Sequence, residues 1–211
     1  MNSFPTSRSN RAARFLAIGF AALLIPQLAP AGIDLTPRYI DTVIEGNTFH
    51  RLYFSDGAKK FVLSLNRETE VTPDSGGALF HFTKVPDATF LVVRSRHSPT
   101  DKFEGPALER YRESAQRLLP VQARASAIRE EIANPFPIND WKSHRIVLTY
   151  EIGAARHMQS VTFLNLNEAD QIVLITSSPE AIFEEAAHRS FQIFRTWQEM
   201  LPGDEKPARG S

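Results

Sequence analysis

Six histidines and 24 acidic residues invite a search for a metal site. Metal-binding helices often carry two histidines one turn apart, as in His-Glu-x-x-His, and that pattern does not occur in this sequence. Asp140 and His144 have the separation of one helical turn, but Pro137 and the β-rich run that follows make a helix improbable there. The remaining histidines stand singly. We therefore expect neither a metal nor another cofactor.

Hydrolytic chemistry needs a presented nucleophile, and the Gly-x-Ser-x-Gly turn that presents a serine in α/β-hydrolases is not found. The carboxylate pairs Glu130-Glu131 and Glu184-Glu185 are adjacent in sequence, so their side chains point in different directions on a helix or a strand. We interpret both pairs as solvated surface. The absence of cysteine excludes thiol chemistry and zinc ribbons. A serine and a histidine brought together from distant positions remain the alternative that would make the protein an enzyme.

The most distinctive stretch is "NPFPINDWKSH", in which two prolines alternate with apolar residues. Each proline pushes the residue before it out of the helical region, so the stretch is predicted to be extended. Phe136, Ile138 and Trp141 supply an apolar centre, and Asp140 and His144 contribute to a polar surround, as in many protein interfaces. The same residues could instead plug the edge of the core. The sequence leaves both interpretations open, and the five residues form our candidate partner-binding site.

The first 31 residues have the three parts of a secretory signal. Three arginines precede an apolar run of 11 residues, and "APA" supplies small residues for cleavage before Gly32. The apolar run is shorter than the ~20 residues that a membrane-spanning helix needs. Because no cysteine follows, a lipoprotein is excluded. We expect a periplasmic or secreted protein with no transmembrane span once the signal is removed.

Without residues 1–31 the chain keeps 180 residues, enough for one ordinary domain that needs no disulfide to fold. The three arginines are the only charged residues of the removed segment. The remaining chain therefore has 21 Lys and Arg and 24 Asp and Glu, a net charge of −3. No basic surplus exists to neutralise phosphates, which argues against a nucleic-acid binder.

The pattern of apolar residues predicts strands in the first half of this domain. A hairpin is expected over residues 39–54, with its turn at Glu45-Gly46-Asn47, because glycine and asparagine tolerate positive φ. The stretch 72–77 is rich in turn residues. Residues 88–96 are apolar on both faces, which is typical of a strand in the middle of a covered sheet. Further strands are expected over 59–65 and 78–84.

Helical periodicity predicts a first helix over residues 106–119. The Ala- and Arg-rich run 121–133 is ambiguous: ordinary helix is favoured over a partner-binding amphipathic helix, and an extended return stays open. Three strands then follow, over 145–152, 158–166 and 171–176. Their connections are too short for a helical crossover, so these strands should form an antiparallel meander.

A second helix closes the domain. We expect Ser177 or Ser178 to cap it, with Pro179 in its first turn, and Pro202-Gly203 to end it. Its apolar stripe should lie on the sheet and comprises Phe183, Ala187, Ser190, Phe194, Trp197 and Leu201. Residues 202–211 are polar and are predicted to be a disordered tail.

This order of elements resembles the PsbP-like fold family, in which the chain ends with a strand, a "P…F" helix start and a helix that finishes near a tryptophan. The matching residues are Pro179, Phe183 and Trp197, and the resemblance covers residues 59–201. It implies an α+β fold in which helices flank an antiparallel sheet on both faces, an α/β/α sandwich. The family is associated with binding and assembly, and fold alone does not fix function.

Together these observations predict an exported, non-catalytic binding or assembly protein whose partner is another envelope or secreted protein. An exported hydrolase is the alternative. The expected organisation is a signal peptide over 1–31, one domain over 32–201 with the 39–54 hairpin as an N-terminal extension, and a tail over 202–211.

Overall fold

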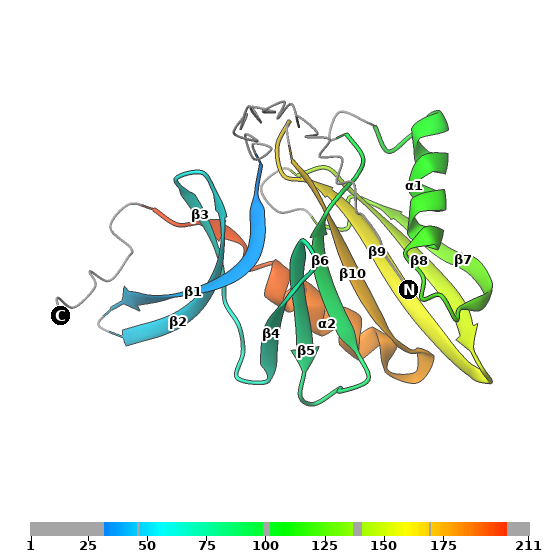
Figure 1. Ribbon diagram of the computed structural model, residues 1–211, viewed down its shortest axis with the longest axis horizontal. Coiled ribbons are helices and arrows are strands. Elements are labelled where there is room, and N and C mark those ends of the chain that lie inside the picture. Colours follow the sequence, from blue (N-terminus) through cyan, green and yellow to red (C-terminus); the bar gives the residue numbers. More distant parts are fainter. Residues whose placement is uncertain (1–31, 46, 99–101, 137–140, 169, 202–211) are drawn as a thin grey trace, which may run out of the picture. The chain divides into compact units, whose positions relative to one another are not determined.

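The computed structural model describes residues 32–45, 47–98, 102–136, 141–168 and 170–201, which all belong to one unit, Ala31–Ser211 (Figure 1). The expected signal segment and the expected tail lie outside the described residues. No described helix is long and apolar enough to cross a membrane.

The chain forms two antiparallel sheets and two helices. One sheet has four strands in the order β1-β2-β3-β11, which are β1 (Asp34–Ile44), β2 (Asn47–Asp56), β3 (Lys59–Leu63) and β11 (Gln198–Glu199). The other has the order β4-β5-β6-β10-β9-β8-β7, comprising β4 (Thr69–Asp74), β5 (Gly77–Phe82), β6 (Thr89–Arg94), β7 (Arg124–Ala133), β8 (Ser143–Ile152), β9 (Ala155–Asn165) and β10 (Gln171–Pro179). The helices are α1 (Gly105–Arg117) and α2 (Phe183–Phe194), and a 3₁₀ turn, η1 (Glu180–Ile182), precedes α2.

The middle of the seven-stranded sheet follows the sequence pattern closely. β8, β9 and β10 form the expected meander, with Leu148 opposite Gln159 and Val161 opposite Ile175. β6, expected in mid-sheet, lies between β5 and β10, and Val92 pairs with Leu174. A strand that is apolar on both faces suits the middle of a sheet, where other elements can cover both faces.

The N-terminal hairpin is the pair β1 and β2, which is longer than the expected range 39–54. The strands pair from Asp34 opposite Ser55 to Ile44 opposite Asn47. Glu45 has φ +50°, the left-handed conformation that the turn requires. The hairpin enters the core at the end away from its turn, through Leu35 of β1 and through Leu52 and Phe54 of β2, all of which are buried.

The helical interpretation of residues 121–133 is wrong, because most of this run forms the edge strand β7. It pairs with β8 from Arg124 opposite Glu151 to Ala133 opposite His144. Alanine, arginine and glutamate favour helix intrinsically, but pairing with an available strand outweighs such weak preferences. Two register shifts and a positive φ at Ala125 interrupt the strand, which is how sheet edges avoid pairing with other chains.

The turn expected over residues 72–77 is much shorter than predicted. β4 extends to Asp74 and pairs with β5, so the turn contains only Ser75 and Gly76. Gly77 begins β5 where no side chain fits, since a Cβ atom there would lie 2.1 Å from the carbonyl oxygen of Val92. The glycines that suggested a long turn therefore serve a tight turn and a close strand pairing.

The closing helix begins later and ends earlier than predicted. β10 continues through Ser178 opposite Met158 and Pro179 opposite His157, so the serines belong to the sheet. α2 starts at Phe183 and stops at Phe194, after which β11 pairs with β3. Leu201, expected in the buried stripe, is exposed.

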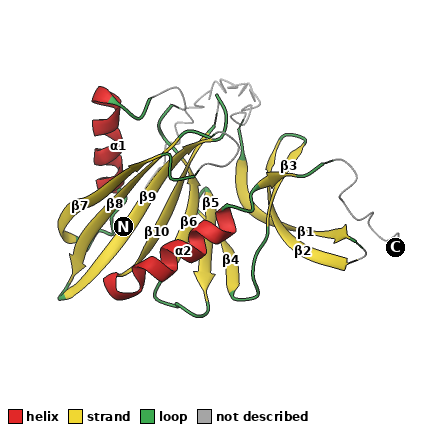
Figure 2. Cartoon of the chain, turned by 180° about the vertical axis from the view of Figure 1, so that it is seen from behind, coloured by secondary structure: helices red, strands yellow, loops and turns green. Residues whose placement is uncertain are grey.

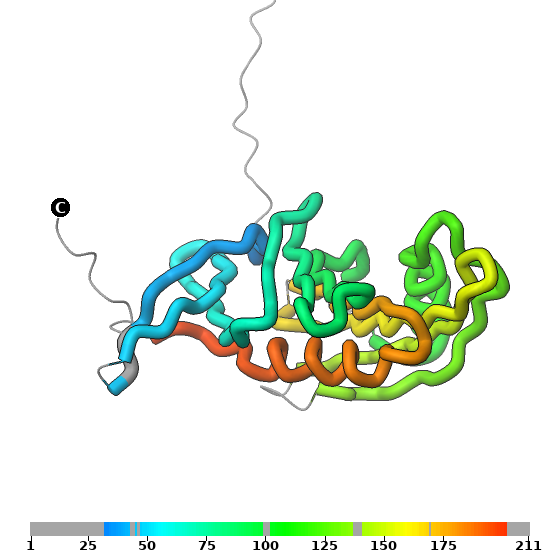
Figure 3. Tube along the Cα trace, turned by 90° about the horizontal axis from the view of Figure 1, so that it is seen from below, coloured from blue at the N-terminus to red at the C-terminus, as the bar shows by residue number. Residues whose placement is uncertain are grey.

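The chain is α+β, as expected, but an α/β/α sandwich is not supported, since eleven strands in two sheets dominate the described residues. α1 packs through Tyr111 and Ala115 on apolar residues of the meander. α2 lies across the seven-stranded sheet (Figure 2), and the chain then continues towards the four-stranded sheet (Figure 3). Residues of α2 and of both sheets share the largest core cluster, which contains Phe54, Phe90 and Phe194.

The first described residues are held against the seven-stranded sheet. The amide of Ile33 donates a hydrogen bond to the carboxylate of Asp170 (3.2 Å), which also accepts one from Arg94 (3.0 Å). Asp170 is 3% exposed. A Cβ atom at Gly32 would lie 2.2 Å from the Arg94 guanidinium and 2.7 Å from the Asp170 carboxylate. Only glycine fits at position 32 without displacing this ion pair.

Candidate functional site

Phe136, the first residue of the predicted partner-binding site, belongs to the core. It is 3% exposed, and its ring stacks on Phe191 (5.2 Å between centroids) and meets Phe194 edge-on (5.7 Å). The guanidinium of Arg145 lies 5.3 Å from the centre of the ring. Phe136 is therefore a core plug in this fold and offers no area to a partner.

His144 is also enclosed, although the sequence placed it in a polar surround. It lies in β8, 5% exposed, with its ring stacked near Phe103 and its Nε2 3.5 Å from a carboxylate oxygen of Glu131. Burial lowers the pKa of His144, and the nearby Glu131 offsets this only in part. Glu131 itself is held by two hydrogen bonds from Arg112, which lower the pKa of its carboxyl.

Ile138 and Asp140 lie outside the described residues, so their part in the predicted site stays a prediction. Trp141 is half-buried and reaches the wall of a surface hollow. Of the three predicted site residues that the structure describes, Trp141 is the one that lines this hollow.

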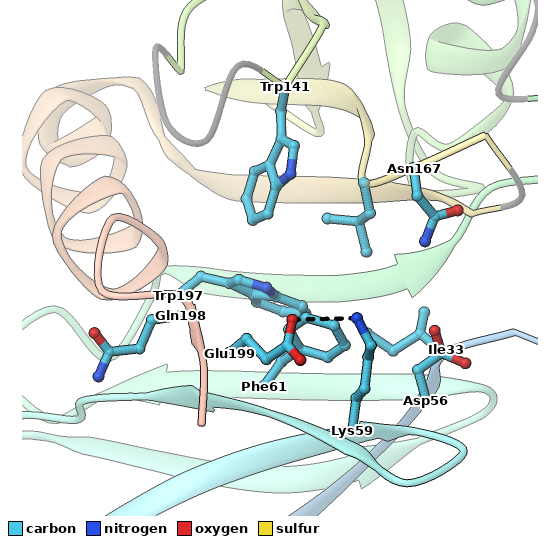
Figure 4. A pocket seen from close by; sticks show the side chains of 10 residues that line it. Ile33, Asp56, Lys59, Phe61, Trp141, Asn167, Trp197, Gln198 and Glu199 are labelled. Atoms are coloured by element: carbon cyan, nitrogen blue, oxygen red, sulfur yellow. Dashed lines mark hydrogen bonds and ion pairs between the residues drawn. The ribbon is translucent and has the colours of Figure 1, made fainter. Parts of the chain in front are cut away.

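We call this surface the tryptophan hollow (Figure 4). Its volume is about 390 Å³, and both tryptophans of the protein line it. The lining residues are Ile33, Asp56, Lys59, Phe61, Trp141, Leu166, Asn167, Trp197, Gln198 and Glu199. Small-molecule and anchor-residue sites have volumes of this order.

Aromatic rings form the apolar part of the hollow. Trp197 is 3% exposed and stacks on Phe61 at 5.6 Å between centroids, while Trp141 meets Trp197 at 6.1 Å in a T-shaped arrangement. The indole nitrogen of Trp197 is buried without a hydrogen-bond partner among the described residues. A buried indole N–H normally finds an acceptor.

Charged side chains form the rim. The ammonium of Lys59 lies 3.3 Å from a carboxylate oxygen of Glu199, and both side chains are about half exposed. Asp56 adds a second carboxylate beside them. The hollow thus combines an aromatic wall with a rim that can exchange ion pairs with a ligand.

The hollow forms because the chain that follows α2 runs to the four-stranded sheet and pairs with it. Backbone hydrogen bonds at the end of α2 position Trp197, whose amide donates to the carbonyl oxygen of Phe194 (3.0 Å). β11 then pairs with β3, with Gln198 opposite Val62 and Glu199 opposite Phe61. Residues that are far apart in sequence meet at this edge of the four-stranded sheet.

Most of this site is not evident from the sequence. The sequence predicts Trp197 only as part of a buried stripe, and it gives no sign that Lys59, Phe61 and Glu199 meet. The signal that could have found them is the pair of tryptophans, because large aromatic residues with a polar tip are enriched at interfaces.

Other polar groupings suggest less chemistry. The described residues contain no cluster of three or more His, Asp or Glu that could hold a metal ion. The closest approach to a nucleophile and base is His97 Nε2 to Ser114 Oγ, at 2.7 Å. The His97 ring is packed against Tyr111 and Phe163.

Comparison with known proteins finds similar solved structures but no similar sequence. No protein-family model matches the chain, and no curated protein matches its sequence. LpqN, involved in cell envelope biogenesis of Mycobacterium tuberculosis, is 9% identical over 78% of this chain and 92% of its own, with a TM-score of 0.46. The Saccharomyces cerevisiae Ran-binding protein Mog1p is 10% identical over 77% and 95%, with a TM-score of 0.43.

The cyanobacterial PsbP (CyanoP) of Synechocystis sp. PCC 6803 is 10% identical over 82% of this chain and 96% of its own, with a TM-score of 0.42. A PsbP protein, of the family that the sequence resembles, and Mog1p are thus among the structures to which this chain is similar. At such identities and TM-scores, these proteins say nothing about the ligand or chemistry of this chain.

Proposed function

We propose that the protein is an exported, non-catalytic binding or assembly protein, and that the tryptophan hollow receives an apolar or aromatic anchor side chain of another envelope or secreted protein. The observation that supports this most directly is the convergence of Trp141, Trp197 and Phe61 on one hollow with a charged rim. Interface hot spots are commonly such anchors seated in a pocket that excludes water.

Intrinsic fluorescence tests the proposal directly, because the chain has two tryptophans and both line the hollow. Partners captured from the envelope fraction and identified by mass spectrometry should shift the tryptophan emission when added to the pure protein. Trp141→Ala should weaken binding by about 2 kcal/mol, the usual threshold for a hot spot. Binding that is unchanged in Trp141→Ala would place the partner elsewhere.

The neighbouring Asp140 provides a second test with a matched control. Asp140→Lys should weaken capture of the partner by ~1 kcal/mol or more while the melting temperature stays nearly unchanged, as for a charge reversed at an interface rim. Asp74→Lys makes the same change on the exposed β4–β5 turn and should leave capture unaffected. If both variants behave alike, the stretch around Trp141 is structural only.

Export is part of the proposal and rests on the N-terminal sequence, with its basic, apolar and small-residue parts. The mature protein should begin at or within a few residues of Gly32. Intact-mass measurement of material from the periplasm or medium decides this. A full-length chain that stays in the membrane fraction would contradict it.

An exported hydrolase is the second candidate, and the contact between His97 and Ser114 is the observation that favours it. A fluorophosphonate probe should label Ser114 if this serine is an activated nucleophile, and Ser114→Ala should abolish the labelling. Labelling that is absent from the wild-type protein removes the candidate.

A further inference from the structure

A second hollow, the arginine hollow, shares Trp197 and Gln198 with the tryptophan hollow and none of its other residues. Its volume is about 470 Å³. The remaining lining residues come from β2, from the chain after β3 and from the chain after α2, and they are Phe49, His50, Arg51, Ser64, Leu65, Arg195 and Thr196.

The two hollows differ in charge. Of the described residues that line the arginine hollow, three are basic and none is a carboxylate, whereas Asp56 and Glu199 accompany a single lysine in the tryptophan hollow. One of the three, His50, has a partner that does not line the hollow: its Nδ1 lies 2.9 Å from a carboxylate oxygen of Asp41. Among the described residues, none forms an ion pair with the exposed guanidinium of Arg195. The lining is therefore suited to an anion.

Arg51 is held in place by the fold, unlike a charged side chain on an open surface. It is 7% exposed, which is rare for arginine. With the Gln198 amide turned so that its oxygen faces Arg51, this oxygen accepts hydrogen bonds from both terminal nitrogens, at 2.7 and 3.2 Å. A guanidinium held in this way is oriented before a ligand arrives, which reduces the entropy lost on binding.

Phe49 and Leu65 provide the apolar part of the same hollow. Phe49 is 46% exposed, an unusual position for a phenylalanine side chain. A volume near 470 Å³ lies in the range of small-molecule sites. Two guanidinium groups beside apolar surface match a ligand with one anionic oxygen group at the end of an apolar chain.

We propose that the arginine hollow binds a free anionic amphiphile, a carboxylate or phosphate carried by an alkyl chain, with Arg195 and Arg51 on the anion and Phe49 and Leu65 on the chain. This site is separate from the partner site at the tryptophan hollow. Either can exist without the other.

The test uses Trp141→Phe protein, in which Trp197 is the single tryptophan and is excited selectively at the long-wavelength edge of its absorption, where tyrosine absorbs little. Octanoate and octyl phosphate are titrated, with octanamide as the neutral probe of equal chain length. We expect saturable quenching by at least one of the two anions and at least tenfold weaker binding of octanamide, because a hydrogen bond to a charged group accounts for about tenfold in affinity or more.

Two single-charge variants then locate the site. Arg195→Gln should raise the dissociation constant of the bound anion at least about tenfold, whereas Lys59→Gln, which removes the cation of the tryptophan hollow, should leave it unchanged. Arg195 is exposed, so the variant is expected to fold, and its melting temperature verifies this. Isothermal titration calorimetry confirms the constants without relying on fluorescence.

The proposal fails if neither anion binds, if octanamide binds as tightly as the anions, or if folded Arg195→Gln binds as tightly as its parent. Sensitivity to Lys59→Gln rather than Arg195→Gln would also overturn it, since the anion would then occupy the other hollow. None of these results affects capture of a partner protein by the tryptophan hollow, which the Trp141→Ala variant tests.

Discussion

Under α1, polar side chains are partly or fully buried and contact one another, whereas around Trp197 they line two open hollows. Arg112 donates two hydrogen bonds to Glu131, whose side chain is 21% exposed, and the amide of Gln171 donates to the hydroxyl of Tyr111 (3.0 Å) inside the core. Near Trp197, by contrast, the Lys59–Glu199 ion pair is exposed to solvent.

The difference separates polar groups that stabilise the fold from those available to a ligand. An enclosed pair keeps its strength because little water competes, and its loss leaves a buried partner unsatisfied. An exposed pair adds little stability, so it can be exchanged for contacts with another molecule at small cost. We therefore expect substitutions under α1 to change stability, and polar substitutions at the hollows to change binding.

The largest effect should come from the aromatic core that supports the hollows. Phe194→Ala should lower the free energy of unfolding by about 3–5 kcal/mol, because Phe194 is fully buried between Phe136 and Trp197. Phe183→Ala, against Val147 and Met158, should cost about as much. Chemical denaturation measures both. A variant that unfolds within error of wild type would show that its phenylalanine is not core.

Removing one enclosed hydroxyl should have a smaller effect. Tyr111→Phe should lower the free energy of unfolding by about 1 kcal/mol, since the hydrogen bond from Gln171 is lost while the ring stays packed. Tyr39→Phe is the matched control, because the Tyr39 hydroxyl lies at the surface, 3.5 Å from the carbonyl oxygen of Val71. Equal losses in the two variants would contradict the distinction between enclosed and exposed polar groups.

Acidification should lower the free energy of unfolding, and the first loss should come from His144 under α1. Because burial lowers the pKa of His144, the unfolded chain takes up a proton near the ordinary value of 6.5 that the folded chain resists, so stability falls as pH drops below that value. From pH 7.5 to 5.5, wild type should therefore lose stability relative to His144→Gln. Parallel pH profiles of the two proteins would refute this.

Glu131 should contribute a second loss at lower pH. Its folded pKa lies below the ordinary value of 4.5, so its stabilising effect is complete above that value and disappears as pH falls through the folded pKa. In Arg112→Gln this acid-dependent component should shrink, since Arg112 is the main cause of the lowered pKa. Denaturant midpoints between pH 5 and pH 3 compare the two proteins.

The smallest effect is expected at the hollow rim. Lys59→Gln should change the free energy of unfolding by less than about 0.5 kcal/mol, because its ion pair with Glu199 is exposed. The measurement is the denaturant midpoint at low and at moderate salt. A loss above about 1 kcal/mol would mean that this pair supports the fold as the enclosed pairs do.

The sequence predicted the parts of the fold that local pattern controls. Short connections and runs apolar on both faces located the meander and the central strand β6. The pattern failed at β7, where charged and alanine residues face solvent at a sheet edge. The apolar residues there recur with neither the helical nor the strand period. It also failed at Ser177 and Ser178, whose capping signal was overridden by pairing with β9.

The candidate site was only partly predictable for a related reason. Trp141 stood out because it lies in a stretch with two prolines that alternate with apolar residues, and it does line the hollow. Its partner Trp197 was predicted to be buried because it continues the stripe of α2, and it is buried, but the sequence did not show that it also lines the hollow. The pairing of Gln198 with Val62, which brings Trp197 beside Phe61, joins segments with no shared sequence signal.

The missing space at Gly32 has a consequence for how this chain could be handled or could evolve. A side chain there would push Arg94 away from Asp170 and loosen the start of β1. If a signal peptidase cuts before residue 32, the residue at this position must also be accepted by that enzyme. The packing of the folded domain and the cleavage reaction would then both restrict which residue can occupy position 32. Leaders or purification tags should therefore be joined upstream of Gly32, and a junction that replaces it should yield a less stable domain even though the tag itself remains outside the fold.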